Sequence, residues 1–289
     1  MAIILQIILN GLLLSTVYGL LAAGISFLYS TSRIFHLAHG IAALGAGYAF
    51  WWVWVGLGFH PAIAALFAVL VVALAGFIMN EYVYEYLRKR GAKGLGYLIA
   101  TLALLMLGTG FIFLLFGAAP KTFNFQTSVL EWRGVTITVF QIWMVIIAIL
   151  LLAAFDWITR FTKFGKAMRA TADNETVAEV LGIDTKTVRR KAFVLASILA
   201  AAAGILYGIE FGLDANRGVT FAVFGFTAAV VGGVGSFRGA VLGSVIIGIF
   251  EQVVVWYSGG GFRNAAVFIL LFLFLLFRPE GIFGTKRTS

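Results

Sequence analysis

Three histidines are the side chains of this sequence best suited to metal binding or acid–base chemistry. His36 and His39 stand three residues apart in the string IFHLAHG, and His60 stands alone. Three-residue spacing brings two side chains to one face of a helix. No further histidine or carboxylate lies close in sequence to complete a metal-ligand set, and the chain has no cysteine. We therefore interpret His36 and His39 as a pair that turns the chain and caps an apolar segment at the cytoplasmic boundary of a membrane.

Glu210 and Glu251 are the acids that fall closest to the interior of long apolar segments. A carboxylate within a membrane is a candidate functional group. Both residues lie near the outer ends of their segments, however, where a side chain that faces a loop costs little. A carrier driven by protons or sodium needs ionisable groups at mid-depth, and this sequence offers few. No nucleophile and base converge either, so the sequence does not predict an enzyme.

A glycine-rich string superficially resembles a nucleotide-binding fingerprint. Gly233, Gly235 and Gly239 form G-x-G-x-x-x-G, which has one residue too many and lacks the strand-then-helix context. The sequence G-x-x-x-x-G-K-[ST] does not occur, so the chain carries no ATP-binding loop of that kind. Any function driven by ATP must therefore take its ATPase from a partner, and we expect no cofactor.

The composition places these residues in a membrane protein. Of 289 residues, 62% are hydrophobic and 11% are charged, whereas about a quarter are charged in an ordinary soluble domain. A net charge of +9 would suggest nucleic acid as the partner of a soluble protein. In a membrane protein, basic residues collect on the cytoplasmic side for topological reasons, so we expect membrane lipid and no nucleic acid as a partner.

Nine apolar segments are the elements that would position the polar residues. They are residues 3–29, 37–59, 61–79, 95–117, 137–155, 192–211, 219–234, 239–257 and 262–277. A helix needs about 20 residues to cross a bilayer. Residues 219–234 are Gly-rich and a little short for a crossing, and they could be re-entrant. The sequence predicts an all-α, polytopic transmembrane helix bundle with 8–9 membrane segments, in a single domain covering 1–289.

The distribution of Lys and Arg orients this bundle. With the amino terminus outside and nine crossings, the inward loops hold 17 of the 21 basic residues and the outward loops hold four. Such a bias is typical of a cytoplasmic face. It predicts an outer N-terminus, a cytoplasmic C-terminus and a cytoplasmic position for the long polar interval at residues 156–191.

This polar interval is the one long water-soluble stretch, with eight Lys/Arg and five Asp/Glu. Residues 170–181 contain neither Pro nor Gly, and Val177, Ala178 and Leu181 form a small apolar stripe at helical spacing. One interpretation is a solvated connector. The sharper one is a surface helix that fits a groove in a cytoplasmic partner.

Local signals divide the interval into two helices. Thr171 or Asp173 is suited to cap the first helix, and Gly182 is suited to end it in a left-handed conformation. A second helix is expected to start after Asp184 or Thr185 and to continue into the sixth apolar segment.

Glycines recur inside the apolar segments, among them Gly40, Gly232, Gly233 and Gly235. Small residues at such spacing allow close helix packing. Glycine also allows helices to break around a central pathway in transporters. We hold both interpretations open for these four glycines and for the neighbouring His39.

Four blocks of the sequence resemble a known family. The string Gly165-Lys166-Ala167-Met168-Arg169-Ala170, with Asn174, Ala178 and Gly182-Ile183, is similar to the cytoplasmic coupling loop of permeases of branched-chain amino acid ABC importers. Three further stretches agree with this family in the same order: Asn10-Gly11 to Arg33-Ile34 with Ala38-His39-Gly40, then Val230 to Glu251, then Arg278 to Gly284. The chain departs from the family pattern at His36, where Asn is usual, and at Ile41, where an acid is usual.

The resemblance implies a pore-forming subunit of the bacterial inner membrane. Its partners would be a second permease, homologous or identical, two cytoplasmic ATP-binding subunits and a periplasmic substrate-binding protein. The resemblance also implies that the ATPase contacts the coupling loop, for which the candidate residues are Arg169, Asn174, Glu175, Ala178, Gly182 and Ile183.

The expected substrate is a branched-chain or related aliphatic amino acid. Importers of urea and short-chain amides share the permease pattern and remain an alternative. A passive channel or secondary carrier is the alternative from another functional class.

Overall fold

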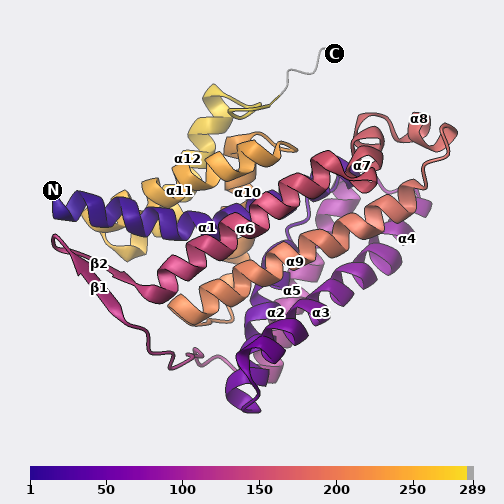
Figure 1. The fold of residues 1–289 in the computed structure, drawn as a ribbon. Helices are drawn as coiled ribbons and strands as arrows, with labels where there is room; N and C mark the ends of the chain where they lie inside the picture. Colours follow the sequence, from indigo (N-terminus) through magenta and orange to yellow (C-terminus); the bar gives the residue numbers. More distant parts are fainter. Residues whose placement is uncertain (285–289) are drawn as a thin grey trace.

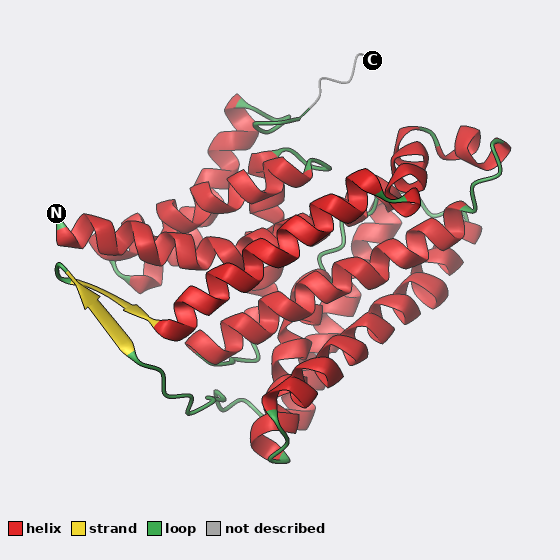
Figure 2. Cartoon of the chain, in the orientation of Figure 1, coloured by secondary structure: helices red, strands yellow, loops and turns green. Residues whose placement is uncertain are grey.

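The chain folds into a bundle of long helices with one small β-hairpin (Figure 1, Figure 2). The computed structural model describes residues 1–284. The α-helices are α1 (Ala2–Ser32), α2 (His39–Trp51), α3 (Pro61–Ile78), α4 (Glu85–Lys89), α5 (Gly94–Phe116), α6 (Val139–Phe161), α7 (Lys163–Asp173), α8 (Glu175–Val180), α9 (Thr185–Phe211), α10 (Arg217–Gly232), α11 (Phe237–Ser258) and α12 (Arg263–Phe277). Two π-helical turns, η1 (Trp52–Gly56) and η2 (Met79–Tyr84), extend α2 and α3, and a 3-10 turn, η3 (Gly260–Phe262), precedes α12.

Helix α1 is the centre of the bundle and packs against α9, α10 and α11. Glycine allows its closest approach: a Cβ added at Gly11 would lie 2.7 Å from the Cα of Ile249 on α11. A Cβ at Gly248 of α11 would meet the carbonyl oxygen of Gly11 at 2.4 Å. Small residues at both positions therefore bring the two backbones into van der Waals contact, the kind of packing that holds helices together in lipid.

Seven helices of the described chain are long and apolar enough to cross a membrane. They are Ala2–Ser32, Pro61–Lys89, Gly94–Phe116, Val139–Phe161, Thr185–Phe211, Phe237–Ser258 and Gly260–Phe277. Helix α10 has 16 residues and is therefore about 24 Å long, shorter than the ~30 Å hydrocarbon core. The polytopic helical bundle expected from the sequence is confirmed.

The second apolar segment begins inside the bundle and not at its boundary. His36 and His39 are 3% and 1% exposed, and His39 lies in a notch against Gly24 of α1, where a Cβ would come within 2.4 Å of its ring. Gly24 is eight residues before the end of α1, so α2 starts about 12 Å inside that end. The chain turns between the two histidines, where the His39 amide bonds the His36 carbonyl at 3.1 Å, and α2 begins at His39. Their position at the membrane boundary stays a prediction, and neither ring faces solvent. The imidazole of His36 hydrogen-bonds the Tyr84 hydroxyl at 2.7 Å.

A β-hairpin occupies part of the connection between α5 and α6. Strands β1 (Val129–Trp132) and β2 (Val135–Thr138) pair antiparallel. The hairpin reaches the first turns of α1, because the Gln6 side chain accepts a hydrogen bond from the Thr136 amide at 2.9 Å and donates one to its carbonyl at 3.1 Å. The all-α description therefore needs this one addition.

The third apolar segment continues as helix for ten residues beyond its expected end at residue 79. Through η2 and α4 the helix runs to Lys89, and it carries Glu81 and Glu85 alongside α9. Both acids have arginine partners there, so the charged continuation is stabilised by ion pairs with α9.

Candidate functional site

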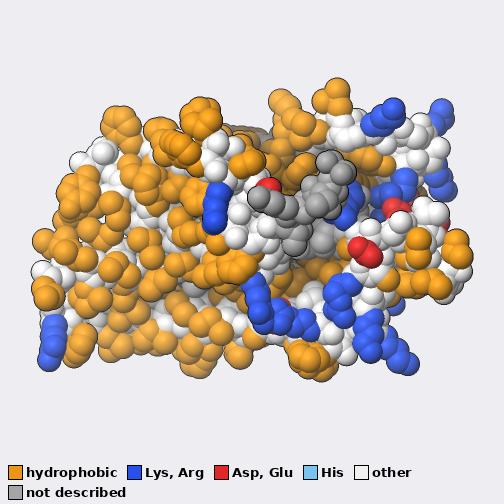
Figure 3. All heavy atoms as spheres, turned by 90° about the horizontal axis from the view of Figure 1, so that it is seen from above, with side chains coloured by type: hydrophobic (Ala, Val, Ile, Leu, Met, Phe, Trp, Pro, Cys, Tyr) orange, Lys and Arg blue, Asp and Glu red, His pale blue; other side chains and the backbone are white. Residues whose placement is uncertain are grey.

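Charged side chains gather at one end of the bundle, which we call the polar end: α4, α7, α8 and the first turns of α9. Lys and Arg cluster toward the side of Figure 3 on which α8 lies, whereas most of the opposite half of that face is hydrophobic. The end of α1 also belongs to this region, because the Arg33 guanidinium bonds the Ala172 carbonyl of α7. The polar end is the part of the molecule best suited to contact a water-soluble partner.

The polar interval forms two short helices before α9, with a break at Asn174. The Asn174 side chain caps α8 by accepting a hydrogen bond from the Val177 amide at 3.1 Å. The prediction of Thr171 or Asp173 as the cap is therefore wrong, because α7 continues through both residues. Gly182 has φ = +83° after α8, as predicted for a left-handed stop.

Arg189 of α9 ties this region together. Its guanidinium donates to Glu85 Oε1 at 2.7 Å and to Glu85 Oε2 at 3.3 Å, and it also bonds Glu175 of α8. The Thr185 hydroxyl lies 3.1 Å from the same group. The Arg189 and Glu85 side chains are only 5% and 7% exposed, so two carboxylates satisfy one buried cation. Through Arg189, α8 is joined to both α4 and α9.

Arg88 extends the network to α1. Its guanidinium bonds Glu175 Oε2 and the carbonyl oxygen of Ser32, each at 3.2 Å. Glu175 therefore points back into the bundle and holds α8 in place. Nearer the surface, Glu81 pairs with Arg190 at 3.1 Å and also with Lys186.

The outward side of α8 and its end is apolar. Val177, Val180 and Leu181 are 52%, 83% and 74% exposed, whereas Ala178 is 1% exposed and packs inward. The predicted stripe of Val177, Ala178 and Leu181 is thus divided between two faces. An apolar patch on a polar, membrane-anchored element is a common sign of a protein-binding surface.

The other residues predicted to couple to the ATPase stabilise the conformation of the polar end. Arg169 bonds the carbonyl oxygens of Thr159 and Arg160, which fixes the corner between α6 and α7. Ile183 packs against the hydrophobic core, and its amide bonds the Ala178 carbonyl at 3.0 Å. Arg169, Asn174, Glu175, Ala178, Gly182 and Ile183 therefore lie in one region of the structure, mostly as supports of α8.

Four glycines and His39 were predicted either to line the pathway or to allow close helix packing. In the structure they lie at tight contacts or in a turn. A Cβ at Gly40 would lie 2.3 Å from the Gly218 carbonyl oxygen of α10, and one at Gly232 would lie 1.9 Å from that of Gly239. Gly233 and Gly235 have φ of +107° and +88° in the turn between α10 and α11. His39 fills its notch beside α1, as described above. Packing accounts for these positions, and a role in a pathway remains a prediction.

Glu251 lies deep in the bundle and not at its surface as expected. Its side chain is 0% exposed, accepts a hydrogen bond from the Tyr18 hydroxyl at 2.7 Å and lies 2.8 Å from Arg263 Nε. Glu210 keeps a more peripheral position and accepts a hydrogen bond from the Gln141 side chain at 2.6 Å. Within residues 1–284, no three or more His, Cys, Asp or Glu side chains form a group that could hold a metal ion.

Sequence reasoning missed the ion pairs of Glu81, Glu85, Arg189 and Arg190. The signal was present, because the acids of NEYVYEYLRKR and the arginines of TKTVRRK both flank apolar segments. Segments that end on the same side of a membrane bring such charges together, so pairing opposite charges across their ends could have found the network.

Comparisons with known proteins agree with one another. Residues 7–277 match the family model described as branched-chain amino acid transport system / permease component. The high-affinity branched-chain amino acid transport system permease protein BraD of Pseudomonas aeruginosa is 30% identical over 99% of this chain and 97% of its own. The corresponding protein LivH of Escherichia coli is 31% identical with the same coverage.

A solved structure shares the fold. PsaBC from Streptococcus pneumoniae, in complex with Fab, contains a chain that superposes with a TM-score of 0.54 at 14% identity, over 95% of this chain and 92% of that one. At this identity the likeness concerns the arrangement of helices.

Proposed function

The chain belongs to the permease-component family of branched-chain amino acid transport systems, and from this membership we propose that it is the membrane-spanning subunit of an ABC importer for branched-chain or related aliphatic amino acids. The relatives are named for branched-chain amino acid transport, which favours this substrate over urea or short-chain amides. A passive channel or secondary carrier is not favoured, since the relatives are permease components of transport systems.

The exposed apolar patch of Val177, Val180 and Leu181 is the observation that carries the proposal. It stands on a helix that Glu175, Arg88 and Arg189 fasten to α1, α4 and α9. A soluble ATPase that binds this patch would move α8, and the ion pairs would pass that movement to three helices at once. The patch thus offers a binding surface for the ATPase, and the helix that carries it is bonded to three other helices. A coupling helix needs both properties.

The charge distribution supports a cytoplasmic position for the polar end. In this topology the N-terminus and the hairpin, at the far end of α1 (Figure 1), lie outside. The carboxy-terminal segment lies on the cytoplasmic side, because Gly284 and Phe283 share a cavity with Ser30 and Arg33 at the end of α1. Nine segments then alternate in direction, of which α2, α10 and α12 are the shortest, with 13, 16 and 15 residues.

The proposed partners are a second permease, homologous or identical, two cytoplasmic ATP-binding subunits and a periplasmic binding protein. The proposed location is the inner membrane of a bacterial cell. Since no ATP-binding loop of the G-x-x-x-x-G-K-[ST] type occurs in the sequence, the energy of ATP would reach this chain through the polar end.

Co-purification with the ATP-binding subunits tests the docking surface. Val180→Glu places a charge in the centre of the apolar patch, and we expect it to abolish recovery of the ATPase while the permease remains inserted. Val129→Glu is the matched control, because Val129 is 61% exposed on the hairpin at the other end of the molecule. Full recovery of the ATPase with Val180→Glu would contradict the docking assignment.

A further inference from the structure

A cavity of about 350 Å³ lies between α2, α3 and α5. Helices α3 and α5 follow each other in the chain, yet α5 packs mainly on α2 while α3 packs on α2 and α9. The space left between them is lined by small and aliphatic side chains, among them Ala42, Gly45 and Leu104, and by aromatic rings, among them Tyr48, Trp52 and Phe116. A Cβ added at Gly45 would meet no atom within 4 Å, so the cavity is open at this point.

A second hollow of about 300 Å³ lies next to the cavity, nearer the turn between α4 and α5. Its walls are Tyr82, Tyr86 and Leu87 on one side and Ala100 and Leu107 on the other, and Leu104 lines both spaces. We call the two together the α3–α5 crevice. Its length runs along the two helices, from their middle to the polar end.

The mouth of the crevice opens on an exposed apolar surface of the molecule. Phe67 and Val71 of α3 are 38% and 41% exposed, and Phe111 and Leu115 of α5 are 61% and 56% exposed. Both helices are long and apolar enough to span a membrane, so acyl chains would reach this surface wherever no partner subunit covers it. An apolar cavity that opens to acyl chains gains dispersion contacts when one of them enters it.

The turn at the polar end of the crevice is basic. Residues 86–93 read YLRKRGAK and contain no acid. Arg90 and Lys93 are exposed, and the Arg90 guanidinium lies over the ring of Tyr86, 5.3 Å from its centroid. Tyr86 is itself a wall residue of the crevice. The positive charge of Arg90 therefore lies at the end of the apolar α3–α5 crevice.

We propose that the α3–α5 crevice binds an anionic phospholipid, with an acyl chain between α3 and α5 and the phosphate beside Arg90 and Lys93. Basic side chains at the inner surface of a membrane attract anionic headgroups. The crevice does not suit an amino acid substrate, since a zwitterion would lose its hydration among hydrocarbon side chains. The inference rests on the proposed topology and not on transport, so it can fail while the transport function stands.

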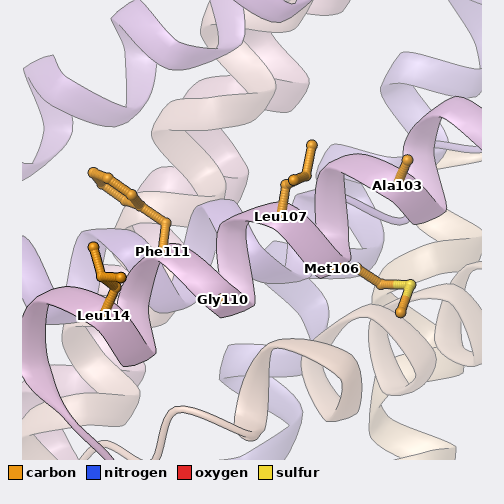
Figure 4. A pocket seen from close by; sticks show the side chains of 6 residues that line it. All are labelled: Ala103, Met106, Leu107, Gly110, Phe111 and Leu114. Carbon is orange, nitrogen blue, oxygen red and sulfur yellow. The ribbon is translucent and has the colours of Figure 1, made fainter.

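Lipid retention tests this site on the full chain purified from membranes. Native mass spectrometry after exchange into phosphatidylglycerol or phosphatidylethanolamine counts the lipids that stay bound. Gly45→Leu adds a side chain to a residue that lines the cavity, where a Cβ meets no atom within 4 Å. Gly110→Leu is the matched control, because an added Cβ at Gly110 also meets no atom within 4 Å. Gly110 lines neither space of the crevice. It lies in an open hollow on the exposed side of α5 with Met106 and Leu114 (Figure 4), and this hollow shares Leu107 with the crevice wall.

We expect the parent chain and Gly110→Leu to retain phosphatidylglycerol and Gly45→Leu to lose it several-fold. The charge arm uses Arg90→Gln with Lys93→Gln, which is expected to lower phosphatidylglycerol retention about fivefold or more. Lys163→Gln with Lys166→Gln removes two exposed charges from α7 as its control. Equal retention by Gly45→Leu and the parent chain, or equal retention of phosphatidylethanolamine and phosphatidylglycerol, would overturn the proposal.

Discussion

Arg189 holds the carboxylate of Glu85 through two hydrogen bonds, of 2.7 Å and 3.3 Å, in a contact almost closed to solvent. The two residues are 104 positions apart in sequence and join α9 to α4. Because the same guanidinium bonds Glu175, the short helix α8 cannot move without disturbing this pair. The contacts of Arg189 with Glu85 and Glu175 thus connect the exposed patch on α8 to the long helices.

Removing the cation of this junction should destabilise the protein strongly. Arg189→Met removes both hydrogen bonds to the buried Glu85 carboxylate and leaves it only the longer ion pair with Arg88, 3.9 Å away, and we expect a loss of about 3–5 kcal/mol. Arg189→Met combined with Glu85→Leu removes both charges and should recover most of that loss. Arg190→Met is the control, since its pair with Glu81 is more exposed and is worth about 0–1 kcal/mol. Thermal unfolding in detergent measures all four proteins, and equal melting of the single and double variants would contradict this account.

A single methyl group at Gly204 should disrupt the packing of α2 on α9. A Cβ there would lie 1.7 Å from the Ala43 carbonyl oxygen and 2.5 Å from its carbonyl carbon. Backbone atoms cannot turn aside, so Gly204→Ala must separate the helices at a cost of about 1–3 kcal/mol. Gly110→Ala, in open space on α5, gains helix propensity and should melt at or above the parent temperature. A parent-like melting temperature for Gly204→Ala would refute the packing.

The hydroxyl of Tyr18 should stabilise the buried carboxylate of Glu251. The two groups are 2.7 Å apart, and both side chains are closed to solvent. Tyr18→Phe removes a hydrogen bond to a charged acceptor and should cost about 1.5–3 kcal/mol. Tyr257→Phe removes an equivalent hydroxyl from a residue that is 81% exposed and should be neutral. Chemical denaturation of the two variants side by side compares the effects.

Asp184 gives the start of α9 a dependence on pH. Its carboxylate accepts hydrogen bonds from the Thr187 hydroxyl at 2.5 Å and the Thr187 amide at 3.0 Å, and these bonds lower the pKa of Asp184 below its ordinary value of 3.8. Stabilisation by this cap is therefore complete above the ordinary pKa and is lost as the pH falls through the lowered one. The melting temperature is measured as the pH is lowered from 6, which is about two units above the ordinary pKa of an aspartate. Asp184→Asn should lack the acid-dependent fall in melting temperature that this cap causes in the parent chain. An unchanged profile would show that the cap carries no such dependence.

The sequence was sufficient for features set by local chemistry. Apolar length identified the long spans, because a lipid-facing helix must be apolar along its whole exposed surface. Gly182 and Asp184 were correctly placed as a left-handed stop and a helix start. The resemblance at Gly165–Ala170 indicated the family that the comparisons then showed.

Features set by distant contacts were beyond the reach of local patterns. Nothing near His39 in sequence shows that Gly24 offers it a notch inside the bundle. Glu251 appeared peripheral because its partner Tyr18 lies on another helix, 233 residues away. The ion pairs of Arg189 were missed for the same reason, although the charges themselves were visible.

ATP-dependent leucine uptake is the measurement that tests the central claim most directly. The chain is reconstituted in proteoliposomes with the proposed second permease, ATP-binding subunits and binding protein, and ATP is supplied on the side of the polar end. We predict uptake that requires both ATP and the ATP-binding subunits and that Val180→Glu abolishes. Leucine uptake of equal rate without ATP, or with the ATP-binding subunits left out, would contradict the claim that a separate motor drives this bundle through α8.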